Sequence, residues 1–394
     1  AVFSPQRHPH TPGTNADGST SAAGTTSGNT NSWWERRQLA DRYLTSFQTT
    51  AVSWMVCDRL LQDDGPVLDG VQQQRRFFAA QTLHTKCRSD VYQLPRESLP
   101  SLRDSLVNHL TRHASSGDTV LMTRLALAVA ALAVQMSWTT VVSDLLKLTS
   151  QSGVVVLEVL RVLPEECASD RLILPDENGR YIMRDHLISS SPAVLQYCQS
   201  HTSTPSEAQR AYGALHTWIR YVPVPPTVIT ETTHMMESTV QTLTVPESDL
   251  HEVAVDLIVE ILRMYPSHIP QNEMLVQKLI PLLLSMLQPA FDRAMQHTTQ
   301  PGHEHDEEDE NMRGYCRIVT EMGESYMSLI LSQQHYQEAS KLVEWVLRCS
   351  SIADKDIASM TLHFWYRFVV DLESIEPYEL RQNIVDAYTP LILK

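Results

Sequence analysis

Glycine is scarce in this sequence, and its scarcity excludes one broad class of fold. Only 13 of the 394 residues are glycine, whereas 42% are hydrophobic. So few glycines disfavour a turn-dense all-β fold, while the apolar content is ample for a buried core. The length allows either two or three globular domains or one extended array.

Cysteine is also sparse, with six residues scattered along the chain and no CxxC pair among them. This pattern predicts buried, reduced thiols of a cytosolic or nuclear protein and no disulfide framework. No secretory signal opens the sequence, and the longest apolar run, LALAVAALAV at 125–134, is about half as long as a membrane span. We therefore expect a soluble intracellular protein with no membrane partner.

Positive charge is in deficit, because 46 acidic residues face 31 basic ones and the formal charge is −15. Nucleic acid attracts proteins through Lys and Arg, so this balance argues against it as a direct partner. A basic protein surface is the more natural partner.

Catalytic and cofactor-binding motifs are missing as well. We find no GxSxG, Walker loop, GxGxxG after a strand, HExxH or paired-carboxylate signature. A helical enzyme would need a deep polar cavity with converging titratable groups instead. The sequence therefore predicts a non-enzymatic protein with no cofactor and no metal.

The densest run of ionisable residues is GHEHDEEDEN at 302–311. Contiguous acidic residues in a flexible run offer no fixed geometry for a metal ion. We interpret the run as a solvated acidic loop between two helices, with an electrostatic docking element and a specific metal site as the alternatives.

Two regions of contrasting composition divide the chain. Residues 1–32 are rich in Gly, Ser, Thr, Asn and Pro and almost devoid of large apolar groups, which predicts a disordered low-complexity tail. From 33 to 394, apolar residues recur at helical spacing between prolines. About sixteen helical segments pair into units of roughly 40 residues, which is typical of HEAT and armadillo arrays. We predict an all-α fold, a HEAT-repeat α-solenoid of about eight repeats.

Two of these segments carry particular helix signals. DTVLMTRLALAVAALAVQM at 118–136 has a possible cap at Asp118 and is apolar nearly all round, so neighbours should cover it on several sides. SGVVVLEVLRVLPEE at 152–166 is rich in valine, but its leucine spacing favours a helix that stops at Pro164.

The stretch RRFFAAQTLHTKCRSDVYQLP at 75–95 predicts a helix with two different faces. At about 100° per residue, one side carries the residues expected in the core. These are Arg76, Ala79, Ala80, Leu83 and Cys87. The other side is polar with an embedded aromatic residue, and consists of Phe78, Gln81, Thr82, Thr85, Arg88 and Ser89.

Two interpretations of this polar side remain open from the residues alone. Phe78 either packs against the adjacent repeat or faces a partner. The polar residues are either simply solvated or line the concave face, where solenoids usually bind other proteins. They are Gln81, Thr85, Lys86 and Arg88.

Several ungapped stretches resemble the N-terminal part of the transportin-SR family, a branch of the importin-β superfamily. Near the start they are WWERRQLADRYLTSFQTTAVSWMVCDRLLQ, FFAAQTLHTKCRSDVYQLPRESLPSLRDSLVNHL, RLALAVAALAVQMSWTTVV and LEVLRVLPEE. Farther on, GYCRIVTEMGESYMSLI and LHFWYRFVVDL resemble the seventh and eighth repeats of that family. The matches keep their order and spacing from about Trp33 to the chain end, and 175–300 is much more diverged.

The resemblance implies a right-handed superhelix of antiparallel HEAT helix pairs that carries cargo through nuclear pores. Such receptors shuttle between nucleus and cytoplasm, contact nucleoporin FG repeats and bind Ran-GTP through an N-terminal arch. The cargo of this branch is splicing factors with phosphorylated Arg/Ser-rich domains. The alternative function is an α-solenoid scaffold that assembles proteins without Ran dependence.

By the same resemblance, residues 70–90 form the second helix of the second repeat and face the inner surface. The Ran-binding residues that it implies lie there and on the following inner helices. They are Phe78, Gln81, Thr82, Thr85, Lys86, Arg88, Arg124 and Gln135.

Two departures from the family pattern affect these expectations. The predicted tail occupies the place of the first helix of the family, so the first repeat is expected to be incomplete. Members of the family are more than twice as long, and their cargo-reading helix lies in the C-terminal part. We therefore expect this chain to be a fragment or a truncated product that keeps Ran recognition.

Overall fold

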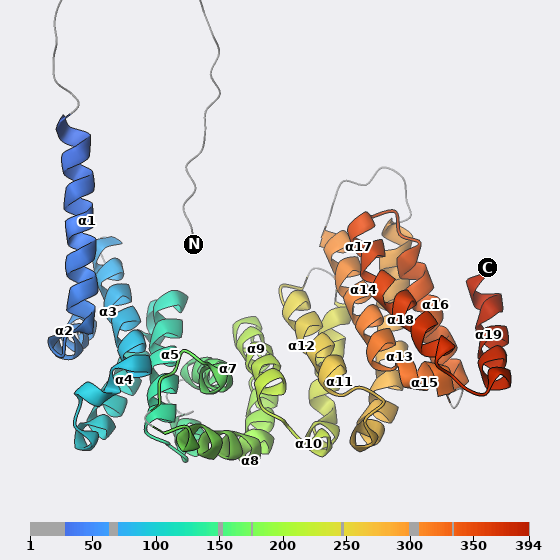
Figure 1. Cartoon of the computed structure of the whole chain (residues 1–394), viewed down its shortest axis with the longest axis horizontal. Helices are drawn as coiled ribbons and strands as arrows, with labels where there is room; N and C mark the ends of the chain where they lie inside the picture. The colour runs from blue at the N-terminus through green and yellow to red at the C-terminus, as the bar shows by residue number, and fades with distance from the viewer. Residues whose placement is uncertain are drawn as a thin grey trace, which may run out of the picture. The chain divides into compact units, whose positions relative to one another are not determined.

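The computed structural model describes residues 28–62, 70–148, 153–174, 176–245, 248–298, 307–332 and 335–393. Throughout these ranges the regular secondary structure is helical, without strands, which confirms the predicted all-α class (Figure 1). The α-helices are α1 (Gly28–Thr49), α2 (Val52–Gln62), α3 (Gly70–Ser89), α4 (Leu99–His113), α5 (Thr119–Gln135), α6 (Val141–Lys147), α7 (Gly153–Ala168), α8 (Asn178–Ser200), α9 (Pro205–Tyr221), α10 (Pro226–Glu231), α11 (Thr233–Thr244), α12 (His251–Met264), α13 (Glu273–Thr298), α14 (Glu307–Ser325), α15 (Met327–Ser332), α16 (Tyr336–Ser350), α17 (Lys355–Met360), α18 (Leu362–Glu373) and α19 (Tyr378–Ile392).

The chain divides into two compact units, and α1 is the described part of the first. This helix begins at Gly28 rather than at Trp33, so residues 28–32 of the predicted tail are helical. The remainder of that tail, residues 1–27, lies outside the described residues. Within α1 the Arg37 guanidinium lies over the rings of both Trp33 and Trp34, at 5.6 and 5.7 Å from their centroids.

The second unit is a stack of helix pairs. One row of helices, α3, α5, α7, α9, α12 and α14, packs each on the next, and α18 packs on α14. Each helix of this row also contacts a sequence neighbour outside it, as in α2/α3, α4/α5, α8/α9, α11/α12 and α13/α14. Because no single pair could bury its apolar face alone, stacking supplies the core, and the fold is a HEAT-repeat α-solenoid.

Helix α5 is enclosed on several sides. The Asp118 carboxylate accepts a hydrogen bond from the Leu121 backbone N–H at 3.0 Å, which confirms the predicted cap. The buried residues of α5 are mostly alanine, leucine and valine, and helices α3, α4 and α7 pack against them. Its all-round apolar sequence therefore reflects burial on several sides, as predicted.

Helix α7 does not stop at Pro164, and the predicted stop is wrong. The proline ring removes the N–H that would bond the carbonyl four residues earlier. That carbonyl belongs to Leu160, and the Trp218 indole Nε1–H donates to it instead at 2.9 Å. Because the Leu160 carbonyl has this donor, α7 continues to Ala168, and Glu166 is a residue of the helix.

Part of the predicted acidic loop is also helical. Helix α14 begins at Glu307, so residues 307–311 belong to its first turns. The rest of the predicted loop, 302–306, lies outside the described residues.

All six cysteines are buried and free, as their spacing predicted. Burial raises the pKa of Cys57 to about 11, so this thiol stays protonated at neutral pH.

Among the residues that the structure describes, one segment, Pro270–His297, is long and apolar enough to cross a membrane. Half of its most apolar window is buried in the fold. Helix α13, which makes up most of it, packs against α10, α11, α14 and α16, as the core helix of a repeat array does.

Candidate protein-binding surface

Helix α3 has the predicted core stripe on one side. Arg76, Ala79, Ala80, Leu83 and Cys87 are all buried, and α5 packs on this helix. The small alanine side chains allow α5 to approach closely. This half of the two-faced interpretation is confirmed.

Two residues that were placed on the polar side of α3 are instead buried. Thr82 is 0% exposed and Lys86 is 1% exposed, because α2 covers this part of the helix. The Lys86 ammonium lies 5.1 Å from the Trp54 ring centroid and donates to Asp90 at 3.1 Å and to Gln93 at 2.8 Å. Neither side chain is available to a partner at the surface, so their predicted exposure is wrong.

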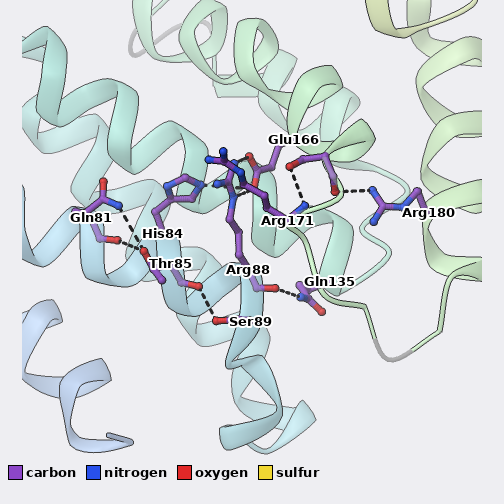
Figure 2. A network of polar contacts seen from close by, with 10 residues as sticks. Gln81, His84, Thr85, Arg88, Ser89, Gln135, Glu166, Arg171 and Arg180 are labelled. Carbon is purple, nitrogen blue, oxygen red and sulfur yellow. Dashed lines mark hydrogen bonds and ion pairs between the residues drawn. The ribbon is translucent and has the colours of Figure 1, made fainter. Parts of the chain in front are cut away.

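Arg88 is engaged inside the fold rather than solvated. Its Nε donates to Glu166 Oε1 at 2.5 Å and its Nη2 donates to Oε2, giving a two-pronged ion pair (Figure 2). The Glu166 side chain is 1% exposed and that of Arg88 is 21% exposed. His84 approaches the same carboxylate, with 3.5 Å between Nε2 and Oε1.

This ion pair changes the protonation behaviour of both partners. Burial by itself would raise the pKa of Glu166, but the hydrogen bonds from Arg88, together with the nearby His84 ring, outweigh it and hold the pKa below its ordinary value. The hydrogen bond to Glu166 raises the pKa of Arg88 further. Both groups therefore stay charged at neutral pH, and the Arg88 charge is paired with Glu166 inside the fold.

Gln135 also has a structural role. Its amide Nε2 donates to the Arg88 carbonyl at 3.2 Å and to the Ile173 carbonyl at 2.8 Å. The Ile173 N–H in turn donates to the Arg88 carbonyl at 2.9 Å. Gln135 thus links the segment after α7 to the C-terminal end of α3. Both hydrogen bonds use its amide nitrogen.

The accessible part of the predicted site is smaller and lies over α3 and α5. Thr85 is exposed and Gln81 is half-buried, and the Thr85 hydroxyl donates to the Gln81 carbonyl at 3.0 Å. On α5, Arg124 is half-buried, and its guanidinium lies 5.9 Å from the Phe77 ring centroid. We call Phe77, Gln81, Thr85 and Arg124 the α3/α5 patch.

The two adjacent phenylalanines differ in exposure, and the sequence-based prediction named Phe78. Phe78 is half-buried, whereas Phe77 is exposed and forms the cation–π contact with Arg124. Neighbouring residues on a helix differ by about 100°, so a small error in the assumed position of the core exchanges their faces.

Cross-helix ion pairs fix the rest of this row of helices. The Glu158 carboxylate of α7 accepts a hydrogen bond from the Thr123 hydroxyl of α5 and pairs with Arg161 of its own helix, each at 2.6 Å. Farther along, Arg263 pairs with Glu321 at 2.9 Å and Asp256 pairs with Arg317 at 2.6 Å. The Thr123–Glu158 hydrogen bond and the two ion pairs between α12 and α14 join residues 35, 58 and 61 positions apart in sequence and were not predicted.

The described residues offer no metal-binding geometry. Within them, no group of three or more His, Cys, Asp or Glu side chains could hold a metal ion. The groups available are those typical of a protein-binding surface. They are an aromatic ring on α3 and a cation on α5, followed by ion pairs between α12 and α14.

Comparison with known proteins finds two family models and several curated relatives that are similar to this chain. Residues 118–300 match the family described as Exportin 1-like protein, and residues 307–394 match the Transportin-3/Importin-13 second TPR domain. The chain is 26% identical to the mRNA transport regulator MTR10 of Saccharomyces cerevisiae over 369 residues, covering 90% of this chain and 37% of that protein. Its homologues are nuclear transport receptors of the importin-β family.

Two other relatives of this family are similar to nearly the same degree. Human Importin-13 is 27% identical over 364 residues and Transportin MOS14 of Arabidopsis thaliana is 27% identical over 357, each covering 87% of this chain and 35% of the relative. These values support the importin-β relationship and do not single out the transportin-SR branch. The chain spans about a third of the length of these curated relatives.

Proposed function

We propose that this chain is the N-terminal segment of a nuclear transport receptor and binds Ran-GTP through the α3/α5 patch. The observation that carries the proposal is that Phe77, Gln81, Thr85 and Arg124 stay accessible together, while Arg88 and Lys86 are engaged inside the fold. An aromatic ring beside an arginine is the composition typical of energetically dominant interface residues. The importin-β relationship supports a Ran-like partner for the N-terminal repeats.

Nucleotide dependence tests this proposal against the alternative of a scaffold without Ran function. We expect the immobilised chain to retain Ran-GTP and not Ran-GDP in a pulldown. Equal retention of both forms, or of neither, would remove the support for a transport role of this segment.

The patch itself is tested by reversing its cation. The double variant Thr85→Glu, Arg124→Glu should weaken Ran-GTP binding by about tenfold, because it removes the cation over Phe77 and adds negative charge. Its melting temperature should stay close to that of the parent chain, since surface substitutions cost about 0.5 kcal/mol or less. The control is Arg96→Glu, an exposed reversal outside the patch, which should leave Ran binding unchanged. Equal loss in both variants would exclude the patch.

We also propose that the receptor contacts nucleoporin FG repeats through an apolar pocket between helices α10 and α11 and helix α13. The pocket has a volume of about 410 Å³, and Ile229, Met236, Leu275 and Leu282 are among its lining residues. A phenylalanine side chain fits an apolar pocket of this size. Leu282→Asp at the half-buried rim is expected to abolish retention on a Phe-Gly repeat resin, and unchanged retention would exclude this pocket.

Within the importin-β family we propose the transportin-SR branch, with Arg/Ser-rich splicing factors as cargo of the full-length receptor. The stretches at 33–62 and 77–110 that resemble this branch support it, as does the match of residues 307–394 to the Transportin-3/Importin-13 domain. Such a receptor would shuttle between nucleus and cytoplasm through the nuclear envelope. Because the chain spans about a third of its relatives, we assign cargo release to the whole receptor and not to this segment alone.

A further inference from the structure

Three dipeptides in which serine or threonine precedes proline lie within the described residues. They are Ser191–Pro192, Thr204–Pro205 and Thr389–Pro390. A hydroxyl residue followed by proline is the minimal sequence that proline-directed protein kinases modify, because proline has no N–H and fits an apolar subsite after the acceptor. The structure decides which of the three hydroxyl groups such an enzyme can reach.

Two of the three dipeptides lie inside helices. Ser191 belongs to α8 and is 0% exposed, and its hydroxyl donates to the Ile188 carbonyl at 2.8 Å. Thr389 belongs to α19 and is exposed, but its hydroxyl donates to the Val385 carbonyl of the preceding turn at 2.7 Å. A kinase aligns the acceptor hydroxyl with the γ-phosphate of ATP by holding the flanking residues in an extended form, which a helical backbone does not have. Neither hydroxyl is presented for transfer.

Thr204 differs from both, because it lies in the short connection between α8 and α9. Its backbone is extended, with φ −114° and ψ 147°, and this is the region that a following proline favours. Thr204 and its neighbours Ser203, Pro205 and Ser206 are all exposed. The acceptor hydroxyl is therefore accessible on a backbone that already has the conformation of a bound substrate at this residue.

The contacts that hold the Thr204 hydroxyl are few and long. It donates to Glu207 Oε2 at 3.1 Å and accepts a hydrogen bond from the Glu207 backbone N–H at 3.3 Å. The N–H groups in the first turn of a helix have no acceptor within the helix, so the start of α9 opens more readily than its interior. Opening this cap frees the hydroxyl without disturbing the stacked core.

We infer that Thr204 is a phosphorylation site for proline-directed protein kinases. Attack of Thr204 Oγ1 on the γ-phosphorus of ATP forms the new O–P bond, the bond from that phosphorus to the β–γ bridging oxygen breaks, and ADP leaves. The hydroxyl proton passes to the catalytic carboxylate of the kinase. Thr204 lies between α8 and α9 and not on the α3/α5 patch, so the inference does not depend on the Ran proposal.

The test is incubation of the chain with ATP and a mitogen-activated protein kinase, which requires proline after the acceptor. Peptide mapping by mass spectrometry then locates the phosphate. We expect at least about tenfold more phosphate on Thr204 than on Thr389 or Ser191, because only Thr204 is exposed outside a helix. Synthetic peptides of residues 199–209 and 384–394 are the sequence controls, and both should be modified because peptides this short do not form stable helices.

The proline itself is tested by substitution. Pro205→Ala keeps the acceptor threonine and should lower its phosphorylation at least about tenfold, since the kinase discriminates through the residue after the acceptor. The matched control is Pro226→Ala, another proline at the start of a helix, which should leave phosphorylation of Thr204 unchanged. Circular dichroism checks that both variants are folded.

Three results would overturn the inference. One is an absence of phosphate on Thr204 in the folded chain, whatever the peptides show. Another is equal phosphate on Thr204 and Thr389, which would mean that the fold does not select the acceptor. The third is unchanged phosphorylation of Thr204 in the folded Pro205→Ala variant, which would exclude recognition through the proline.

Discussion

Replacing Arg88 with glutamate is expected to lower the free energy of unfolding by about 3–5 kcal/mol. The change removes both hydrogen bonds to Glu166 and places a second carboxylate beside one that is 1% exposed. A buried charge that loses its partner is far more costly than an exposed one. Urea denaturation followed by circular dichroism at neutral pH measures the loss.

Thr85→Glu is the matched control for this variant, since it introduces the same side chain one turn away at an exposed position. It should change the free energy of unfolding by no more than about 0.5 kcal/mol. The swapped pair Arg88→Glu, Glu166→Arg should recover part of the loss. Equal effects of Arg88→Glu and Thr85→Glu would mean that the Arg88–Glu166 pair contributes nothing to stability.

The same pair predicts a dependence on pH. The folded pKa of Glu166 lies below its ordinary value of 4.5, so the stabilisation is complete above about pH 4.5 and fades as the pH falls through the folded pKa. The stability difference between the parent chain and Arg88→Glu should therefore narrow in acid. A difference that stays constant down to the acid transition would contradict a charged Glu166.

Leu83→Asp is expected to have the second large effect, a loss of about 3–5 kcal/mol in the free energy of unfolding. Leu83 is 1% exposed on the side of α3 that contains Ala79 and Ala80, so the new carboxylate has neither water nor a partner. Because each repeat is stabilised by its neighbours, hydrogen exchange should also accelerate in α5. Thermal melts and hydrogen exchange by mass spectrometry measure the two effects.

Thr85→Asp provides the comparison for Leu83→Asp, with the same charge on the same helix at an exposed position. It should leave the melt and the exchange of α5 close to those of the parent chain. If both variants melt at the same temperature, the two faces of α3 do not differ in burial and the core stripe is misassigned.

The local features of the fold could be predicted because each depends on residues close together in sequence. The buried stripe of α3 follows from helical periodicity, and the Asp118 cap depends on a residue three positions away. Burial of the six cysteines follows from their apolar character and the absence of pairing motifs. These expectations needed no knowledge of how the helices stack.

Features that depend on a third helix could not be predicted in this way. Periodicity assigns faces relative to one covering neighbour, so it placed Lys86 at the surface, either solvated or facing a partner, whereas α2 covers it. Continuation of α7 past Pro164 depends on an indole N–H from α9, 58 positions from Leu160. No pattern around the proline indicates that donor.

For the α3/α5 patch, the sequence by itself determined a helix in the stretch 75–95 with an apolar side and polar residues opposite, because side-chain periodicity is a local property. Only the tertiary structure decided which of those polar residues remain available. Arg88 pairs with Glu166, 78 positions away, and Gln135 donates hydrogen bonds to two backbone carbonyls. Phe77 and Arg124, by contrast, contact each other at the surface. The physical reason is that a charge or a donor is satisfied by whichever partner stacking brings within hydrogen-bond distance, and stacking joins residues that sequence spacing does not relate.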